Sequence, residues 1–347
     1  MIEPTPAPAR APRPERRGPE RRPLVVAHRG ASGYRPEHTR AAYELAVTLG
    51  AEAVEPDIVA TRDGVLVLRH ENEISGTTDV AARTEFAGRR TTKTIDGARL
   101  TGWFTEDFTW AELSTLRARE RLPQVRQAST RFDGRYPILR LRDLTAILDA
   151  APHPVRMVAE IKHATYFASI QLPLDELFAA EMAGWASRER LTIEAFEQTV
   201  LHELAGRGVP AQYVYLLEKV GTPADLVARY GAAALSYAGH LTDEGLERLA
   251  GSVDGISVET PLIARPPRRG ENPVASDLVE RAHAAGLQVF TWTLRPENRF
   301  LPGALRIGTA PAAHGDWLAW FRLLMGTGLD GVFADHPDLA LEARATL

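Results

Sequence analysis

The sequence predicts an α/β protein that folds as a TIM (β/α)8 barrel, with a small insertion on the C-terminal face of the barrel. Two observations support this fold: short apolar runs alternate with segments of helical periodicity, and eight such runs are present. Alternating strands and helices favour a parallel sheet, and eight repeats are the number that closes a barrel. The chain has 347 residues, of which 44% are hydrophobic, so it can fill a core of that size.

Each expected strand is a short apolar run bounded by polar or glycine-rich turns, and the segments between strands carry apolar residues three or four positions apart. The eight strands are expected at residues 24–27, 52–60, 155–161, 190–196, 212–217, 254–258, 287–293 and 331–334. The first helix is expected to start at Thr39, and another helix is expected over about residues 171–186. Residues 232–237 could form a ninth strand, but we place them in a loop.

Two segments fall outside this repeat. Residues 1–23 are rich in Pro and Arg and contain few large apolar side chains, so we expect a disordered tail before a barrel domain at residues 24–347. Residues 71–136 follow a hairpin signalled by Asp63-Gly64 and are polar, with weak apolar periodicity. We interpret residues 71–136 as an insertion on the loop side of the barrel, with a small core of its own. It could cover the site or mediate formation of a homodimer.

The composition excludes several classes of function. The formal net charge of −4 provides no global positive field for nucleic acid, and the chain contains no cysteine for a disulfide, a zinc–thiolate site or a cysteine nucleophile. No apolar run approaches the about 20 residues that span a bilayer, and the run at residues 24–27 is too short for a signal peptide. We therefore expect a cytoplasmic protein with a small-molecule partner, although a secreted protein whose precursor has been clipped would show the same sequence.

The most informative stretch is His28-Arg29-Gly30, at the end of the first expected strand. Imidazole can transfer a proton near neutral pH, guanidinium binds phosphate oxygens through paired hydrogen bonds, and glycine allows a sharp turn beside a ligand. A second histidine, His70, ends the hairpin strand. Taken singly, either residue could be an ordinary histidine that makes only a structural hydrogen bond.

Acidic residues show a similar placement. Glu55 and Asp57 are two positions apart on one strand, so both side chains point to the same face. Two such carboxylates repel each other unless a cation lies between them, and an all-oxygen site suits Mg²⁺ or Ca²⁺. Glu160 and Lys162 repeat this spacing on a later strand, where they could supply a third metal ligand and a cation for phosphate. The alternatives are a carboxylate pair held by arginines, which is commoner for an isolated Glu-x-Asp, and a Glu–Lys pair at the barrel rim.

Together these residues favour an enzyme site over the separate structural interpretations. All of them fall at the C-terminal ends of expected strands, where barrel enzymes keep their active sites. Two histidines, a metal and two cations fit the hydrolysis of a phosphodiester. One histidine would remove a proton from the nucleophile, and the other would protonate the leaving alkoxide.

The order of these motifs resembles the glycerophosphodiester phosphodiesterase family. The motifs that carry the resemblance are His28-Arg29-Gly30, Pro36-Glu37-His38-Thr39, Glu55-Pro56-Asp57, Thr61-x-Asp63-Gly64 followed by His70, Glu160-Ile161-Lys162, Thr291-Trp292-Thr293-Leu294 and residues 330–337. The insertion after His70 resembles the branch that includes the bacterial periplasmic enzymes. The resemblance implies release of sn-glycerol 3-phosphate and an alcohol such as choline or ethanolamine.

The resemblance also implies a role for each matching residue. His28 and His70 match the acid/base pair; Glu55, Asp57 and Glu160 match the ligands of one divalent cation, Ca²⁺ or Mg²⁺; Arg29 and Lys162 match the residues that bind the phosphate; Trp292 matches an aromatic residue that packs on the glycerol carbons; and Glu37 matches a loop position that we expect to support these side chains from behind. Two departures stand out. Glu71 directly follows the second histidine where the family usually has Asp, and the signal peptide of the periplasmic branch is not recognised in the sequence.

Two other functions stay open at this point. A lyase of the sphingomyelinase D type shares a similar barrel and histidine pair but forms a cyclic phosphate. Such enzymes usually carry disulfides, and the absence of cysteine from this chain argues against that function. The other alternative is a glycerophosphodiester-binding protein without turnover, which the presence of both histidines and all three carboxylates argues against. The products formed would distinguish the three functions.

Overall fold

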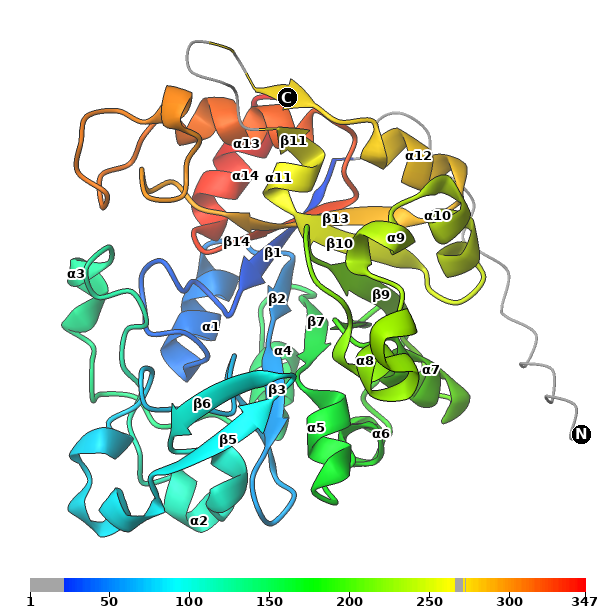
Figure 1. Ribbon diagram of the computed structural model, residues 1–347. Helices are drawn as coiled ribbons and strands as arrows, with labels where there is room; N and C mark the ends of the chain where they lie inside the picture. Colours follow the sequence, from blue (N-terminus) through cyan, green and yellow to red (C-terminus); the bar gives the residue numbers. More distant parts are fainter. Residues whose placement is uncertain (1–21, 266–270, 272) are drawn as a thin grey trace, which may run out of the picture.

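The computed structural model describes residues 22–265, 271 and 273–347 of the chain (Figure 1). Most of the tail predicted at residues 1–23 therefore lies outside the described residues. Pro23 is buried, and its carbonyl accepts a hydrogen bond from Arg344 Nη1 at 2.8 Å. This residue thus belongs to the packed structure.

In the described part of the chain, eight parallel strands close into a barrel, as the sequence predicts (Figure 1). Their order around the barrel is β2–β1–β14–β13–β10–β9–β8–β7, and pairing between β2 and β7 closes the ring. The strands are β1 (Leu24–His28), β2 (Ala53–Glu55), β7 (Arg156–Ile161), β8 (Leu191–Ala195), β9 (Gln212–Leu217), β10 (Gly255–Glu259), β13 (Gln288–Leu294) and β14 (Gly331–Ala334). Because all of them run in the same direction, their C-terminal ends open onto one face of the barrel.

The second predicted strand, at residues 52–60, is divided in two by Pro56. Proline has no N–H to donate to a strand ladder, so β2 ends at Glu55 and β3 (Asp57–Ala60) begins after it. β3 pairs in parallel with β7 and antiparallel with β4 (Leu66–Leu68), which confirms the predicted hairpin. The break leaves one carboxylate on either side of the proline.

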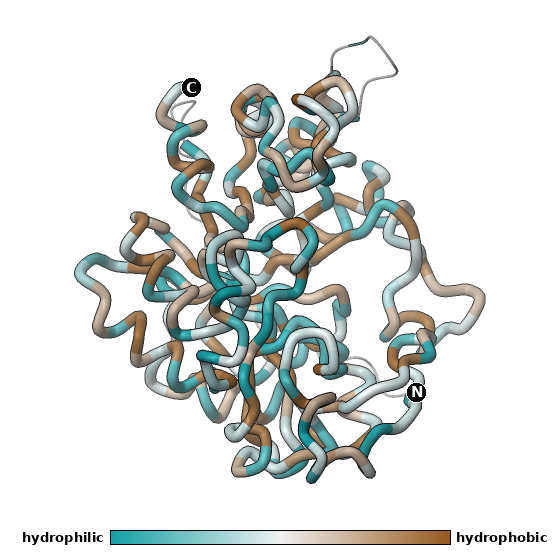
Figure 2. Tube along the Cα trace, turned by 90° about the vertical axis from the view of Figure 1, so that its left-hand side faces the viewer, coloured by the Kyte–Doolittle hydropathy of each residue, from teal (hydrophilic) through white to brown (hydrophobic). Residues whose placement is uncertain are grey.

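Helices surround the barrel and bury one apolar face against it, and Figure 2 shows the resulting alternation of hydrophobic and hydrophilic positions along the trace. They are α1 (Arg40–Thr48), α4 (Leu141–Asp149), α5 (Ala164–Ser169), α6 (Leu174–Met182), α7 (Gln198–Gly206), α8 (Ala224–Tyr230), α10 (Asp243–Ala250), α12 (Leu278–Ala284), α13 (Trp317–Met325) and α14 (Pro337–Ala345). The predicted start of α1 is confirmed: Thr39 is its N-cap residue, and Thr39 Oγ1 accepts the N–H of Ala42 at 3.2 Å. The helix predicted over residues 171–186 is too long at both ends, because α6 spans only Leu174–Met182. Pro173 delimits α6 on its N-terminal side. None of the helices among the described residues has the length and apolar character needed to cross a bilayer.

Short elements connect the larger ones. They are α9 (Tyr237–His240), α11 (Thr260–Ile263), the strand pair β11 (Ala264–Arg265) and β12 (Val274–Ala275), and the 3₁₀ turns η4 (Gly231–Ala233) and η5 (Gly303–Leu305). Residues 232–237 form no strand, so their placement in a loop region is confirmed. A turn of 3₁₀ helix and the start of α9 occupy this segment instead.

The core has two layers because neighbouring residues in a strand point to opposite sides. Val26 of β1 points into the barrel, whereas Val25 and Ala27 belong to the outer layer between the strands and the helices. The residues that fill the barrel interior are Val26, Ala53, Val158, Val214, Phe290 and Phe333. The filled barrel is therefore a firm support for side chains at its C-terminal face.

The segment between β4 and α4 includes the predicted insertion at residues 71–136, and it contributes no strand to the barrel. It contains η1 (Val80–Ala82), η2 (Thr84–Arg89), the hairpin of β5 (Thr91–Ile95) and β6 (Ala98–Gly102), η3 (Thr105–Asp107), α2 (Trp110–Leu113) and α3 (Gln127–Thr130). Its side chains Trp103, Phe108 and Leu113 are buried and are continuous with the outer core layer. The insertion thus shares the main core, where the sequence suggested a separate small one.

Candidate active site

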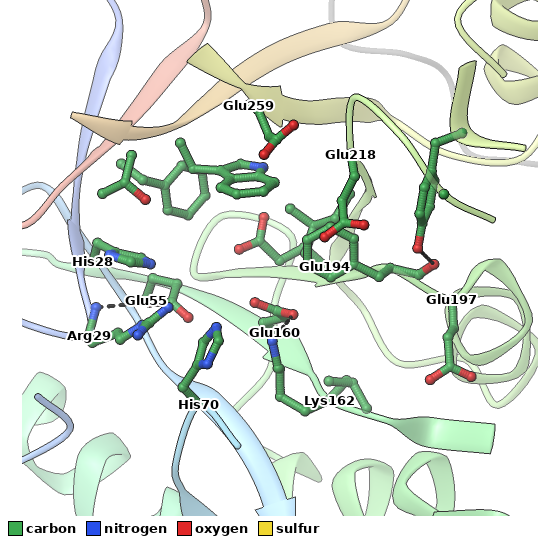
Figure 3. A pocket seen from close by; sticks show the side chains of 18 of the residues that line it. His28, Arg29, Glu55, His70, Glu160, Lys162, Glu194, Glu197, Glu218 and Glu259 are labelled. Atoms are coloured by element: carbon green, nitrogen blue, oxygen red, sulfur yellow. Dashed lines mark hydrogen bonds and ion pairs between the residues drawn. The ribbon is translucent and has the colours of Figure 1, made fainter. Parts of the chain in front are cut away.

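A pocket of about 600 Å³ opens at the C-terminal ends of the barrel strands (Figure 3). The predicted site residues that line it are His28, Arg29, Glu55, His70, Glu160, Lys162 and Trp292. The other two lie directly behind the pocket wall, where both Asp57 and Glu37 are buried against Arg29. Strand register explains the convergence, because His28 is paired with Glu55 and Asp57 is paired with Glu160.

The turn after β1 sets the position of Arg29. Arg29 and Gly30 both have positive φ, at 60° and 79°, so the chain turns sharply at the end of the strand. A Cβ on Gly30 would lie 2.7 Å from the backbone carbonyl carbon of Ala42, so a side chain there would displace the start of α1. The backbone N–H of Arg29 donates to Glu55 Oε2 at 2.8 Å, which ties the turn to the neighbouring strand.

Three carboxylates, those of Glu55, Asp57 and Glu160, form a group that could hold a metal ion. One oxygen from each lies within 4.8 Å of the others, and all three side chains are buried. Glu55 Oε1 and Asp57 Oδ1 accept no hydrogen bond from the residues that the structure describes. Buried charged oxygens without partners are costly, and a divalent cation would satisfy them. We call this group the carboxylate triad; its all-oxygen donor set fits a hard divalent cation.

The electrostatics of the carboxylate triad favour the same conclusion. Burial and the neighbouring Asp57 raise the pKa of Glu55 well above its usual range, and burial raises the pKa of Glu160 to about 8. Burial acts in the same direction on Asp57, but Arg29 and Lys162 help to outweigh it and hold the pKa of Asp57 well below its usual range. Arg29 and Lys162 therefore do not balance the charges that the three carboxylates would carry when ionised. A divalent cation bound among them would supply the missing positive charge.

Arg29 and Lys162 are held at the carboxylate triad by ion pairs. Arg29 Nε lies 3.1 Å from Asp57 Oδ2, and Lys162 Nζ lies 2.9 Å from Glu160 Oε1. Burial opposes the charge on both groups, but the surrounding carboxylates outweigh it and raise the pKa of each above its ordinary value. Two fixed positive charges therefore face the pocket, where they can bind an anionic oxygen.

Glu37 lies behind Arg29, away from the pocket. Its Oε2 accepts a hydrogen bond from Arg29 Nη1 at 3.0 Å, and its two oxygens accept from Arg121 Nε and Nη2 at 2.7 Å. Burial alone would raise the pKa of Glu37, but the two guanidinium groups hold it well below the usual range. An ionised Glu37 thus fixes the orientation of Arg29, and Arg121 brings the insertion into contact with the site.

His28 reaches the pocket with one ring nitrogen already engaged. His28 Nδ1 lies 2.6 Å from Asp335 Oδ1 at the end of β14, and Asp335 Oδ2 accepts hydrogen bonds from Arg126 and Arg295. Burial would raise the pKa of Asp335, but the two arginines outweigh it and hold the pKa well below the usual range. The ionised Asp335 makes Nδ1 the donor, so Nε2 is the nitrogen left for proton transfer. Burial and Arg29 lower the pKa of His28 to about 4, so the imidazole is neutral at pH 7.

His70 has a carboxylate partner on the same nitrogen, but from its own neighbour in sequence. Its Nδ1 contacts Glu71 Oε1, and Arg121 Nη1 lies 3.6 Å from that oxygen. Burial and Arg29 lower the pKa of His70 to about 3. Burial would raise the pKa of Glu71, but its contact with His70 outweighs burial and lowers it to about 2. Glu71 therefore supplies the carboxylate at this position although the sequence resemblance leads one to expect Asp.

Several residues around the site were given no role by the sequence analysis, although His38 and Asp335 lie within motifs that it quoted. Asp335 and its arginine partners come from distant segments, although Asp335 directly follows the last strand and could have been suspected from that position. His38 Nε2 lies 2.9 Å from Asp57 Oδ2 and helps to fix that carboxylate. Glu194 of β8 is buried and lines the pocket, and its place near a strand end is the signal that could have found it.

Comparisons with known proteins agree with this geometry. The sequence model of the glycerophosphoryl diester phosphodiesterase family matches residues 28–339. The chain is 31% identical to the glycerophosphodiester phosphodiesterase GDPD6 of Arabidopsis thaliana, over 90% of this chain and 84% of that protein. It is 30% identical to the probable glycerophosphodiester phosphodiesterase 1 of Mycobacterium tuberculosis, over 78% of this chain and 82% of that protein.

Solved structures share the fold. One is an Oleispira antarctica phosphodiesterase in complex with the product sn-glycerol-3-phosphate, with a TM-score of 0.59 and 18% identity over 93% of this chain and 96% of that one. Another is a glycerophosphoryl diester phosphodiesterase from Parabacteroides distasonis, with a TM-score of 0.56 and 15% identity over 95% of this chain and 88% of that one. These structures support the barrel, and the family match extends over most of the sequence. The chain belongs to the glycerophosphoryl diester phosphodiesterase family.

Proposed function

We propose that this family member hydrolyses glycerophosphodiesters to sn-glycerol 3-phosphate and an alcohol. One observation carries the proposal: two histidines, each with Nδ1 bound by a carboxylate, line the same pocket as two fixed cations and two members of the carboxylate triad. The names of the curated relatives give the same activity for those proteins. Acid/base groups, cations and metal ligands are the combination that phosphodiester hydrolysis requires.

The two histidines act as the acid/base pair in this proposal. Nε2 of one, His28 or His70, takes a proton from the attacking water as its oxygen bonds to phosphorus. Nε2 of the other gives a proton to the alcohol oxygen as the bond between that oxygen and phosphorus breaks. Both imidazoles are neutral before substrate binds, because burial and Arg29 lower their pKa values. The arriving phosphate anion offsets the charge of Arg29, so that one imidazole can then carry a proton. Arg29 and Lys162 hold the phosphate oxygens between them.

Glu55, Asp57 and Glu160 would hold one divalent cation. When bound, the cation supplies a Lewis acid that stabilises negative charge on the phosphate oxygens. Mg²⁺ and Ca²⁺ both bind carboxylate oxygens, and they differ in the number of ligands that they take. Because the carboxylates come from one divided strand and its neighbour, their spacing is set by the sheet before the ion arrives.

Trp292 and Glu37 have supporting roles in this proposal. Trp292 lines the pocket on β13 and lies edge-on to Phe196, with ring centroids 5.7 Å apart. A half-buried indole of this kind can pack on the carbon atoms of glycerol while the hydroxyl groups stay in contact with polar groups. Glu37 acts on the reaction by holding Arg29 in place.

The test is release of sn-glycerol 3-phosphate from glycerophosphocholine, followed with a coupled dehydrogenase, with and without a chelator. We expect release that the chelator abolishes and that added Mg²⁺ or Ca²⁺ restores, and the better of the two identifies the preferred ion. A cyclic phosphate as the product would overturn the proposal in favour of a lyase. Tight binding of glycerophosphocholine without any product would favour the binding protein. A cytoplasmic location and formation of a homodimer stay predictions.

A further inference from the structure

One arginine of the insertion, Arg121, connects two parts of the candidate active site. Its Nε and Nη2 donate to the two oxygens of Glu37 at 2.7 Å, and its Nη1 lies 3.6 Å from Glu71 Oε1. Glu37 also accepts a hydrogen bond from Arg29, and Glu71 contacts Nδ1 of His70. A single guanidinium group therefore joins the partner of a phosphate-binding cation to the partner of an acid/base histidine.

The shape of the guanidinium group suits this double contact. The group is planar and rigid, and its edge with Nε and Nη2 matches the two oxygens of one carboxylate. Glu37 occupies that edge of Arg121, which leaves Nη1 for the ion pair with Glu71. Burial would lower the pKa of Arg121, but Glu37 outweighs it and raises the pKa above its ordinary value. The separation of the two carboxylates is therefore set by one rigid, charged group.

The backbone on both sides of Arg121 is fixed within the insertion. The N–H of Glu120 donates to Asp133 Oδ1 at 2.7 Å, and Glu120 Oε1 accepts the N–H of Leu122 at 2.8 Å. The side chain of Arg121 is 27% exposed, so its carbon atoms fill no part of the buried core. The insertion thus presents this guanidinium group from a defined place at the edge of the site.

A different arginine holds the backbone of the same loops together. Arg69 is buried, and its Nη2 donates to the carbonyl of Glu37 at 2.8 Å, while its Nη1 donates to the carbonyl of Thr77 in the insertion at 3.2 Å. These bonds tie the loop after β1 to the insertion without Arg121. The contacts of Arg121 therefore act on the carboxylate groups of its partners, and the path of the chain has its own support.

We propose that Arg121 is a positioning residue of the reaction, which orients His70 through Glu71 and Arg29 through Glu37. His70 and Arg29 line the pocket, as Figure 3 shows, whereas Arg121 is not one of the described residues that line it. It therefore acts through the two carboxylates and not by contact with the substrate. A displacement of a reacting group by about 1 Å can cost about 10²-fold in rate, so such support affects catalysis. The inference rests on the proposed function and gives the insertion a part in the same site.

The first experiment measures kcat and KM for glycerophosphocholine in the metal-loaded full chain. We expect Arg121→Met to lower kcat about tenfold through His70 and to raise KM about threefold through Arg29. Arg121→Lys keeps the charge without the planar edge and should give a kcat between the two. Arg119→Met removes a 52% exposed arginine of the same segment and should keep the wild-type values. Wild-type kcat and KM in Arg121→Met would overturn this inference alone, and a wild-type chain without turnover would overturn the proposed function as well.

The second experiment separates positioning from a structural role. If Arg121 acts on His70 through Glu71, the double variant Arg121→Met/Glu71→Gln should lose about tenfold in kcat, as each single variant does, whereas independent effects would multiply to about 100-fold. Calorimetric titration with the metal ion gives the fraction of chains with an intact carboxylate triad, and kcat is expressed per such chain. A multiplied loss in the double variant would overturn the inference, and so would a loss in Arg121→Met that disappears after this correction.

Discussion

The two histidines of the pocket are held in place by very different parts of the molecule. His28 is oriented by Asp335, which lies 307 positions later in the sequence, directly follows the last strand of the barrel and accepts hydrogen bonds from two arginines. His70 is oriented by Glu71, the next residue, on a partly exposed segment at the start of the insertion. In both histidines a carboxylate contacts Nδ1. For His28 the contact forms between distant segments when the barrel closes, and for His70 it forms between neighbouring residues.

Because of this difference, substitutions beside the two histidines should affect the stability of the fold and the catalytic activity differently. The support of His28 is a buried ion network, and removing one member leaves the others charged and unpaired in the interior. The support of His70 is a partly exposed pair, whose loss leaves groups that water can reach. We therefore expect damage on the His28 side to lower both stability and activity, and damage on the His70 side to lower activity alone.

The largest expected effect is a loss of kcat, and it is the same for both histidines. His28→Ala and His70→Ala should each lower kcat for glycerophosphocholine by about 10³-fold, because each removes one of the two proton-transfer groups. The measurement is steady-state turnover, with metal binding by calorimetry as the control for an intact carboxylate triad. A variant that keeps kcat within tenfold of the wild type would show that its histidine is not part of the acid/base pair.

The second prediction concerns stability and separates the two sides. Asp335→Asn should lower the free energy of unfolding by about 3 kcal/mol, because it removes the charge that Arg126 and Arg295 share in a buried setting. Urea denaturation measures the change. Asp243→Asn, which removes an exposed ion pair with Arg281, is the matched control and should cost about 0.5 kcal/mol or less. Equal losses in the two variants would contradict the distinction between a buried and an exposed network.

The third prediction tests the local side. Glu71→Gln should lower kcat about tenfold while leaving the free energy of unfolding nearly unchanged, because the carboxylate that orients His70 is lost at a partly exposed position. Glu71→Asp keeps the charge and should retain more activity than Glu71→Gln. Turnover and urea denaturation of both variants provide the check. A large loss of stability in Glu71→Gln would mean that this side is as integral to the fold as the other.

The smallest expected effect is a pH dependence. The pKa of Asp335 in the folded chain lies below its value of about 3.9 in the unfolded chain, so its stabilising contribution is complete above that pH and is lost as the pH falls toward the folded pKa. The difference in unfolding free energy between wild type and Asp335→Asn should therefore be constant from about pH 7 to pH 5 and shrink below about pH 4. A difference that stays constant down to pH 3 would contradict an ionised Asp335.

The sequence predicted those parts of the site that are marked by local spacing. Glu55 and Asp57 could be recognised because they are two positions apart in one apolar run, although Pro56 divides that run into two strands, and His28 could be recognised because it ends the first apolar run. The barrel itself followed from the alternation of strands and helices. Each of these inferences needs only neighbouring residues and the common direction of the strands.

What the sequence did not predict depends on contacts between distant segments. Arg126 lies in the insertion and binds Asp335, 209 positions away, and no local pattern distinguishes it from the other arginines of that segment. Arg121 reaches Glu37 across 84 positions in the same way. Glu194 was overlooked because a single carboxylate in an apolar strand has no spacing that marks it. Residues of this kind can be assigned only from the three-dimensional structure, because the closed barrel brings them to the site.

The two arginines of the insertion have a practical consequence for protein engineering. Loops on barrel scaffolds are often treated as cassettes that can be exchanged between relatives to alter specificity. Here a transplanted or shortened insertion would have to return one guanidinium group to Asp335 and another to Glu37. Without them, each buried carboxylate would keep one arginine partner in place of two, Arg295 for Asp335 and Arg29 for Glu37. Grafts into this chain should therefore keep Arg121 and Arg126 with their flanking turns and vary the β5–β6 hairpin, which contributes neither residue.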